Sequence, residues 1–351
     1  MASKDMLPLA SGFWPIFLKS QLHYKAQFPP KNTNLSGQFA IITGGNQGLG
    51  FESARQFLSL RLSYLVITVR SEEKGKAAAS KLQAEYPNAT IKVWLLDMCS
   101  YDSIQAFVKR IESELPRLDI AILNAGRSKA EFELVSSTGH EETMQVNYLS
   151  TMLLATLLLP ILKNKSPQGT PGRLSIVSSG TTLLTKFSNS QRSPLLKSFD
   201  DIKISPTPGI QTYGATKVLC QMFIYKLVDY VSADDVVVNL VDPGMTRGTG
   251  LNRDVPRVMR TLAAPVMVGF CRSVTDGASS YLDASVVKGK ESHGCFIMDW
   301  EIRPFPPLLY TKNGKATIER LWQETLDEFD FAGISSVLES MKKTDLDVVR
   351  L

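Results

Sequence analysis

Phe39-Ala-Ile-Ile-Thr-Gly-Gly-Asn-Gln-Gly-Leu-Gly50 joins a short apolar run to a turn rich in glycine. The β-branched run predicts a buried strand over 39–43, and the apolar spacing after it predicts a helix over 51–62. Gly44 and Gly48 can take a positive φ and have no Cβ, so the backbone there can approach a pyrophosphate. A helix N-terminus favours the negative charge of that group. The order strand, glycine turn, helix therefore indicates a dinucleotide site, although a purely structural glycine turn gives the same short pattern.

Further apolar runs alternate with helical patterns along the chain. The runs that predict strands are Leu65–Val69, Ile91–Leu96, Leu118–Leu123 and Arg173–Val177. This alternation predicts an α/β doubly wound parallel sheet, the Rossmann fold, which binds ligands at the carboxyl ends of its strands. Asp97 and Met98 follow one strand, and Asn124-Ala125-Gly126 follow the next. Asp97 can accept a hydrogen bond from an adenine amino group, and the small residues let the backbone lie against a cofactor. Ordinary strand-to-helix loops are the alternative for both segments.

Arg70 directly follows the strand predicted over 65–69, with Lys74 one helical turn further on. NAD sites place an acidic residue near this point to hold the ribose hydroxyls, and none stands at the end of this strand. A guanidinium forks well onto a phosphate, so the sequence favours NADP(H) over NAD(H). The alternative is a helix N-terminus in water, which the first-turn acids Glu72 and Glu73 also fit.

Tyr213 and Lys217 lie four residues apart on a predicted helix, so both side chains share one face. A tyrosine is a poor acid at neutral pH because its unperturbed pKa is about 10. A nearby ammonium stabilises the phenolate, which makes the pair a plausible proton donor and its tuner. A serine hydroxyl from the strand end at Ser178-Ser179 can stabilise charge on a substrate oxygen. Alone, the Tyr-x-x-x-Lys spacing is common by chance on surface helices.

In combination these motifs resemble the short-chain dehydrogenase/reductase family over residues 37–300, nearest to its retinol-dehydrogenase-like branch and fungal natural-product members. The resemblance implies that Tyr213 is the catalytic acid/base and that Lys217 lowers its pKa and holds the nicotinamide ribose. It also implies that Ser179 positions the carbonyl and that Asn147 anchors a water in a proton relay. The cofactor-binding residues are then Gly44, Asn46, Gln47, Gly48, Leu49, Gly50, Arg70, Lys74, Asp97, Met98, Asn124, Ala125, Gly126, Tyr213, Lys217, Pro243, Gly244 and Thr246. Pro243-Gly244 would close over the nicotinamide, with Thr246 near its carboxamide.

The chain departs from the family pattern in the spacing of serine and tyrosine. Ser179 precedes Tyr213 by 34 positions, where the family has about a dozen, so 183–210 is interpreted as an insertion. Ser178 or Ser179 could supply the catalytic hydroxyl, with Thr181 or Thr182 as substitutes. We choose Ser179 because the second serine of such a pair is usual in the family.

The 351 residues are interpreted as an N-terminal arm (1–36), one oxidoreductase domain (37–300) and a C-terminal extension (301–351). The apolar stretch Gly12–Leu18 is too short to span a bilayer, so it predicts either an arm packed on the body or an interfacial membrane anchor. Within the domain, 247–272 is expected to be an apolar lid for a lipophilic substrate, or a core helix. Trp300–Tyr310 would wall the pocket or brace the sheet edge. The helices near 147–162 and 212–230 form a homodimer face in the family, or serve only the core here.

Composition limits the remaining functions. A hydrophobic content of 44% and a charged content of 21% fit a globular protein. The net charge of +5 comes from scattered basic residues, which argues against nucleic-acid binding. The four cysteines and three histidines have no metal-ligand spacing and fit reduced thiols in a cytoplasmic protein, membrane-associated if the arm is an anchor.

The sequence therefore predicts an NADP-dependent oxidoreductase that acts on a lipophilic ketone or alcohol, in a pathway that makes polyketides or terpenoids. The alternatives are a catalytically silent nucleotide-binding scaffold or sensor, because fold does not guarantee function, and a related dehydration or epimerisation at the same site.

Overall fold

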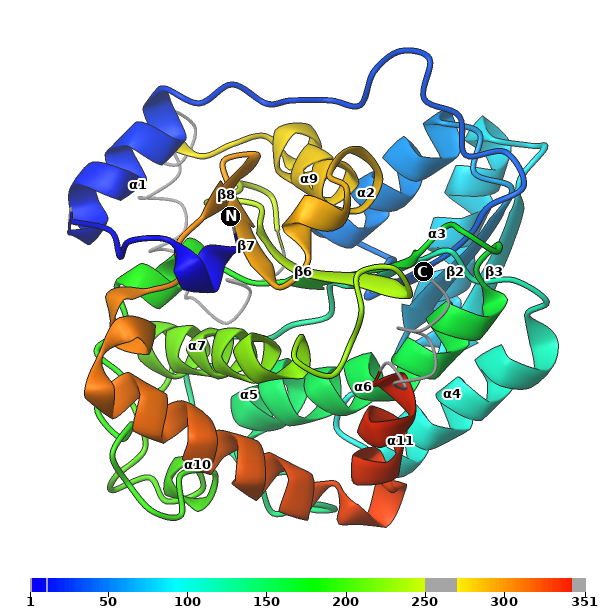
Figure 1. The fold of residues 1–351 in the computed structure, drawn as a ribbon. Helices are drawn as coiled ribbons and strands as arrows, with labels where there is room; N and C mark the ends of the chain where they lie inside the picture. Colours follow the sequence, from blue (N-terminus) through cyan, green and yellow to red (C-terminus); the bar gives the residue numbers. More distant parts are fainter. Residues whose placement is uncertain (1, 11, 250–269, 343–351) are drawn as a thin grey trace, which may run out of the picture.

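A computed structural model describes residues 2–10, 12–249 and 270–342 and shows a central sheet covered by helices on both faces (Figure 1). Its strands are β1 (Phe39–Thr43), β2 (Tyr64–Val69), β3 (Thr90–Leu95), β4 (Ile120–Leu123), β5 (Gly172–Val177), β6 (Val236–Asp242), β7 (Cys295–Met298) and β8 (Glu301–Arg303). Its helices are α1 (Phe13–Leu22), α2 (Gly48–Ser59), α3 (Glu72–Glu85), α4 (Tyr101–Glu114), α5 (Glu142–Met144), α6 (Ser150–Lys165), α7 (Ile210–Leu227), α9 (Val274–Leu282), α10 (Lys312–Glu328) and α11 (Ile334–Met341).

The strands run in the order β3-β2-β1-β4-β5-β6-β7-β8. The first seven are parallel, and β8 pairs antiparallel with β7. The order reverses between β1 and β4, which is where an open parallel sheet binds its ligand. The predicted Rossmann fold is confirmed. Helix α2 begins at Gly48, three residues before the predicted start, because the glycine turn itself forms the first helical turn.

Two apolar cores lie on opposite faces of the sheet. Side chains of α2, α3 and α9 form one core, and side chains of α4, α6, α7, α10 and α11 form the other. The continuous helical run Glu142–Lys165 is apolar and long enough to cross a membrane, but 89% of its most apolar window is buried inside the protein. It is therefore the central helix of this second core.

The C-terminal helices cover α6 and α7. The Trp322 ring of α10 stacks on Tyr230 at 5.2 Å between centroids and lies 5.0 Å from the Phe223 ring of α7. The Tyr148 hydroxyl, in the helical run that leads into α6, bonds Thr325 at 2.6 Å. Part of the surface that the family resemblance assigned to a dimer thus packs against this same chain, and the homodimer stays a prediction.

The segment interpreted as an insertion, 183–210, also packs on α10. The backbone N–H groups of Leu195 and Leu196 each donate to the Glu324 carboxylate at 2.8 Å. His140 bridges the two parts, because its ring lies 2.9 Å from Asp200 and 3.1 Å from Glu328. The insertion and the C-terminal helices therefore support each other.

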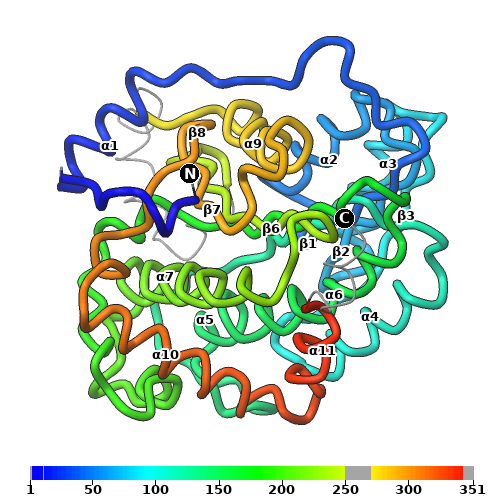
Figure 2. The backbone as a smooth tube through the Cα atoms, in the orientation of Figure 1, coloured from blue at the N-terminus to red at the C-terminus, as the bar shows by residue number. Residues whose placement is uncertain are grey.

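The N-terminal arm is attached to the far edge of the sheet. The Ser3 hydroxyl donates to the Arg303 carbonyl of β8 at 2.6 Å and accepts from the Phe296 N–H of β7 at 2.8 Å. Helix α1 lies beside β8, and the chain then crosses the molecule to enter β1 (Figure 2). Of the two alternatives for 300–310, the first part braces the sheet edge as β8. The expected lid, 247–272, falls mostly on 250–269, which lie outside the described residues.

Candidate active site

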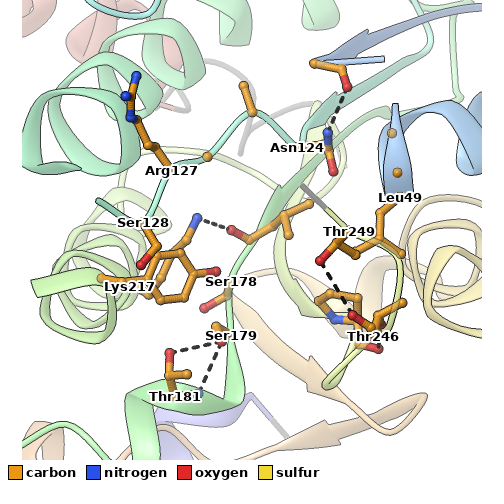
Figure 3. A pocket seen from close by; sticks show the side chains of 18 of the residues that line it. Leu49, Asn124, Arg127, Ser128, Ser178, Ser179, Thr181, Lys217, Thr246 and Thr249 are labelled. Atoms are coloured by element: carbon orange, nitrogen blue, oxygen red, sulfur yellow. Dashed lines mark hydrogen bonds between the residues drawn. The ribbon is translucent and has the colours of Figure 1, made fainter. Parts of the chain in front are cut away.

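A cavity of about 800 Å³ opens at the carboxyl ends of the central strands and gathers most of the predicted site residues. The predicted residues that line it are Gly44, Asn46, Gln47, Gly48, Leu49, Gly50, Arg70, Lys74, Asp97, Met98, Asn124, Ala125, Gly126, Ser179, Tyr213, Lys217, Pro243, Gly244 and Thr246. Of the predicted residues, Asn147 alone is absent from this lining and lies buried behind it. Figure 3 shows part of the cavity, with Ser179, Thr181 and Lys217 on one side and Leu49 and Thr246 on another.

The glycine turn is held against β4 by short polar contacts. The Asn124 side-chain amide donates to the Thr43 carbonyl at 2.8 Å, and the Ala125 N–H donates to the Thr43 hydroxyl at 2.9 Å. Gly44 has a φ of +66°, and a Cβ on Gly50 would lie 2.5 Å from the Gly44 carbonyl oxygen. Only glycine therefore fits at Gly50, and the turn keeps its backbone exposed toward the cavity.

Arg70 and Lys74 lie at the rim of the same cavity. Both side chains are exposed, and Arg70 directly follows the last residue of β2. Ser71 caps α3 by accepting from the Lys74 N–H at 3.5 Å. Two cations thus stand beside the cavity where a dinucleotide site carries its ribose-binding residue.

Ser179 and Tyr213 meet at the wall of the cavity. Burial raises the pKa of Tyr213, and the neighbouring Ser179 hydroxyl lowers it in part. The Ser179 oxygen accepts from the Thr181 N–H at 3.2 Å and from the Thr181 hydroxyl at 3.0 Å. Since both acceptor positions of Ser179 are used, its own proton points to another acceptor. Ser178 is buried and accepts from Gln221 at 3.2 Å, so the geometry favours Ser179 of the two serines.

Lys217 lies buried one helical turn beyond Tyr213. Its ammonium donates to the Val177 carbonyl at 2.7 Å and lies 5.7 Å from the centroid of the Tyr213 ring. Burial lowers the pKa of Lys217. A cation this close to the phenol stabilises a phenolate when Tyr213 loses its proton.

Asn147 lies in a π-helical turn, Gln145–Leu149, between α5 and α6. Its side chain clamps the loop after β4, because it accepts from the Arg127 N–H at 2.8 Å and donates to the Arg127 carbonyl at 2.8 Å. Its backbone carbonyl accepts from the Cys220 thiol at 3.2 Å. π-Turns often occur at functional sites, and the water-anchoring role of Asn147 stays a prediction.

The comparisons with known proteins agree with this geometry. Residues 38–191 match the short chain dehydrogenase family. The chain is 57% identical over 343 residues to the short chain dehydrogenase/reductase mfmJ of Annulohypoxylon moriforme, covering 97% of this chain and 99% of that protein. It is 44% identical over 315 residues to the short chain dehydrogenase virL of Hypocrea virens, covering 90% and 92%. The chain belongs to the short-chain dehydrogenase/reductase family.

Solved structures of this family share the fold. A short chain dehydrogenase of Shigella flexneri, complexed with NADP, aligns with a TM-score of 0.56 at 21% identity and covers 76% of this chain and 98% of its own. The chain is thus a short-chain oxidoreductase with relatives in fungi, and a nicotinamide cofactor is expected. The residues present fit such a group, because the cavity is continuous from Arg70 to Tyr213 and a Cβ on Gly126 would come within 3.7 Å of the Lys217 ammonium.

Two residues of this short-chain dehydrogenase site, Asp242 and Tyr281, are not among those predicted from the sequence. Asp242 is buried in the cavity wall directly before Pro243-Gly244; burial raises its pKa, and its charge raises that of Tyr213. Tyr281 of α9 donates to Asn124 at 2.9 Å and orients the amide that clamps the glycine turn. The position of Asp242 next to the Pro-Gly pair was a readable signal, whereas Tyr281 reaches the site from 157 residues away.

Proposed function

We propose that this protein is an NADPH-dependent carbonyl reductase that acts on a lipophilic ketone, or catalyses the reverse oxidation of the alcohol, in a fungal polyketide or terpenoid pathway. The observation that carries the proposal is that Ser179, Tyr213 and Lys217 line one cavity wall, with the Lys217 ammonium 5.7 Å from the centroid of the Tyr213 ring. Bound NADPH would supply the hydride that adds to the carbonyl carbon. The fungal origin of relatives 57% and 44% identical supports the pathway.

Tyr213 supplies the proton in this reaction. Burial raises its pKa, so the phenol stays protonated at neutral pH and can donate to the substrate oxygen as the alcohol forms. Ser179 donates a second hydrogen bond to that oxygen, since its own acceptor positions are used by Thr181. Lys217 stabilises the phenolate that remains, because its ammonium lies near the ring. Because these three groups are held in fixed positions around the substrate oxygen, their positioning supplies much of the rate enhancement.

The preference for NADPH rests on Arg70 and Lys74. The 2′-phosphate distinguishes NADPH from NADH, and a planar guanidinium binds phosphate oxygens with two donors. Both cations are exposed at the cavity rim, so they can reach such a group from the solvent side of the cavity. The NADP held by the Shigella flexneri dehydrogenase supports this preference by analogy of fold.

The test is the Tyr213→Phe variant, assayed by NADPH consumption with a panel of lipophilic ketones. We expect kcat to fall by about 10²- to 10⁴-fold, because the proton donor is lost, while the Kd for NADPH stays unchanged. Fluorescence titration measures that Kd with no need for turnover. A variant as active as the wild type overturns the proposed mechanism. Binding of NADPH without turnover in either protein favours the scaffold or sensor alternative.

A further inference from the structure

The aromatic face of α1 lines the same cavity as the catalytic residues. Phe13, Phe17 and Trp14 from the N-terminal arm share the lining with Ser179 and Tyr213, although more than 160 positions separate the two groups in sequence. Neither the glycine turn nor the Tyr-x-x-x-Lys pair accounts for aromatic residues at this place. An arm that only covered the body would bury these rings in the protein core, whereas Phe13 and Phe17 stay partly exposed beside the cavity.

Helix α1 has two distinct faces. Phe13, Phe17 and Ser20 are spaced by four and three residues, so they form one stripe, and Ser20 at its end is buried. Trp14, Leu18 and Leu22 form the neighbouring stripe and are 64%, 44% and 53% exposed. The first stripe therefore faces the body and the cavity. On the second stripe Leu18 and Leu22 face outward, and Trp14 is largely exposed but also touches the cavity.

A buried ion pair fixes α1 to the cavity wall. The Ser20 hydroxyl donates to the Asp299 carboxylate at 2.5 Å, and the Arg272 guanidinium donates to the Ser20 carbonyl at 3.1 Å. Arg272 also pairs with Asp299 and donates to the Pro243 carbonyl at 3.1 Å. Arg272 and Asp299 are 8% and 2% exposed, so a loss of either partner would leave a buried charge. The arm is thus held to the Pro243-Gly244 turn of the site.

The backbone around this anchor is unusual. Asp299 and the following Trp300 have φ values of +57° and +58°, a region that side chains other than glycine rarely adopt. The Arg272 guanidinium lies 4.6 Å from the centroid of the Trp300 ring, which covers the ion pair from the other side. Asp299 and Trp300 are the two loop residues of the hairpin that joins β7 to β8, and a two-residue type I′ hairpin turn requires a positive φ at both positions. This tight turn places the Asp299 carboxylate beside Ser20 and Arg272.

The rings of α1 are arranged to contact a flat group. Phe13 and Phe17 stack at 5.5 Å between centroids with planes 20° apart, and Trp14 meets Phe13 edge-on at 5.3 Å. Nearby lining residues are also apolar, among them Leu183, Leu184, Ile210 and Met245. Aromatic pairs in such geometry are stabilised beyond the burial of their apolar area.

We infer that α1 is a wall of the substrate site and that its Phe13 and Phe17 rings bind an aromatic body of the carbonyl substrate. This inference rests on the proposed function, because it assigns the substrate class of the same cavity. The N-terminal arm then determines which carbonyl compounds are accepted, while Ser179, Tyr213 and Lys217 determine the reaction. Phe13 and Phe17 act on binding and not on the chemical step.

Turnover of matched aldehydes tests the inference. With naphthaldehyde and NADPH, Phe17→Ala should raise KM by about 10-fold with kcat within about twofold, the pattern of lost uniform binding. Phe17→Leu keeps an apolar side chain without the ring and should raise KM by about threefold. Benzaldehyde is too small to reach Phe17, so its KM should change little in either variant. Leu22→Ala, on the outward stripe of the same helix, is the matched control and should match the wild type. Equal effects of Phe17→Ala and Leu22→Ala would overturn the inference.

A binding measurement separates this inference from the proposed function. Prodan, a naphthyl ketone whose emission shifts to the blue in apolar surroundings, reports occupancy without turnover. Wild type and Leu22→Ala should bind it equally, and Phe13→Ala/Phe17→Ala should bind it about 10-fold more weakly, with thermal melting confirming that the variant is folded. If the double variant binds prodan more weakly but the wild type reduces none of the carbonyl compounds, the inference about α1 is supported and the proposed function is wrong. If the double variant has the turnover and the prodan affinity of the wild type, the proposed function is supported and the inference about α1 is wrong.

Discussion

The two ends of the cavity are built in different ways. At the nucleotide end, the turn between β1 and α2 is one short stretch of chain, clamped by the Asn124 amide. At the substrate end, the wall combines α1, the loop after β5, the start of α7 and the Pro243-Gly244 turn. The shape of the backbone determines the nucleotide end, and side chains from segments distant in sequence determine the substrate end.

This difference separates what must stay constant from what can vary. A glycine turn that approaches a pyrophosphate tolerates almost no added atom, because the constraint is steric. An apolar wall tolerates exchange of one apolar side chain for another at modest cost, because the constraint is volume. Changes at the nucleotide end should therefore abolish function, and changes at the substrate end should redirect it.

The largest expected effect is that of Gly50→Ala. The new Cβ would lie 2.5 Å from the Gly44 carbonyl oxygen and 2.6 Å from the Asn124 amide nitrogen, both held in place by the turn. We expect the Kd for the nicotinamide cofactor to rise by at least about 100-fold and the unfolding free energy to fall by about 1–3 kcal/mol. Fluorescence titration and urea unfolding measure the two quantities.

Gly12→Ala is the control at the substrate end. Gly12 precedes α1, and a Cβ there would meet no atom within 4 Å. Its cofactor affinity and its stability should both match those of the wild type. If Gly50→Ala behaved like Gly12→Ala, the steric account of the nucleotide end would be wrong.

The same contrast explains how much could be predicted. The strands β1 to β5, the glycine turn and the residues at those strand ends could be predicted because each depends on a few neighbouring residues, whereas β6, β7 and β8 were not predicted. The local sequence pattern does not predict the π-turn that contains Asn147. The Cys220 thiol that donates to the Asn147 carbonyl comes from α7, which is distant in sequence. For the N-terminal arm, the sequence shows only an apolar stretch, which fits either an arm packed on the body or a membrane anchor. Its anchor joins Ser20 to Asp299, 279 positions apart, and no periodicity reveals such a contact.

Trp300–Tyr310 illustrates the same limit at the sheet edge. The prolines and large apolar groups predicted a structural role without saying which one, and only pairing with β7 decides that the segment begins as β8. Likewise Glu324 and Glu328 of α10 gave no sign that they support the segment 183–210. Charged residues on an amphipathic helix usually face water, so their buried partners appear only in three dimensions.

An effect of intermediate size is expected for His140→Gln. This change removes the side chain that connects the segment 183–210 to α10 beside the substrate end. Burial would lower the pKa of His140, but hydrogen bonds and charges from Asp200 and Glu328 outweigh it and raise the pKa from 6.5 to about 9. A raised folded-state pKa stabilises the protein fully below pH 6.5, and this stabilisation is lost as the pH rises through 9. The variant should be less stable than the wild type by about 3 kcal/mol at about pH 6.

Urea unfolding across this pH range measures the difference, which should shrink toward alkaline pH. His23→Gln, at an exposed position after α1, is the matched control and should show no comparable change. Cofactor affinity should be retained in His140→Gln at low temperature, because the bridge lies away from the cavity lining. A stability loss that did not depend on pH would argue that His140 acts through packing and not through its charge.

The smallest expected effect concerns the nucleotide end itself, where the proposed preference for NADPH rests on exposed side chains and not on the backbone. Arg70→Ala should raise the Kd for NADPH by about 10-fold, equivalent to about 1.4 kcal/mol, and leave that for NADH within about twofold. The effect is modest because the guanidinium is exposed, so solvent and salt screen its charge. It should therefore shrink as the salt concentration rises. Arg192→Ala, exposed in the segment 183–210 and outside the cavity lining, changes the net charge equally and should leave both affinities unchanged. Equal losses for NADPH and NADH in Arg70→Ala would mean that Arg70 contacts a part common to both cofactors, and the preference for NADPH would then need another residue to carry it.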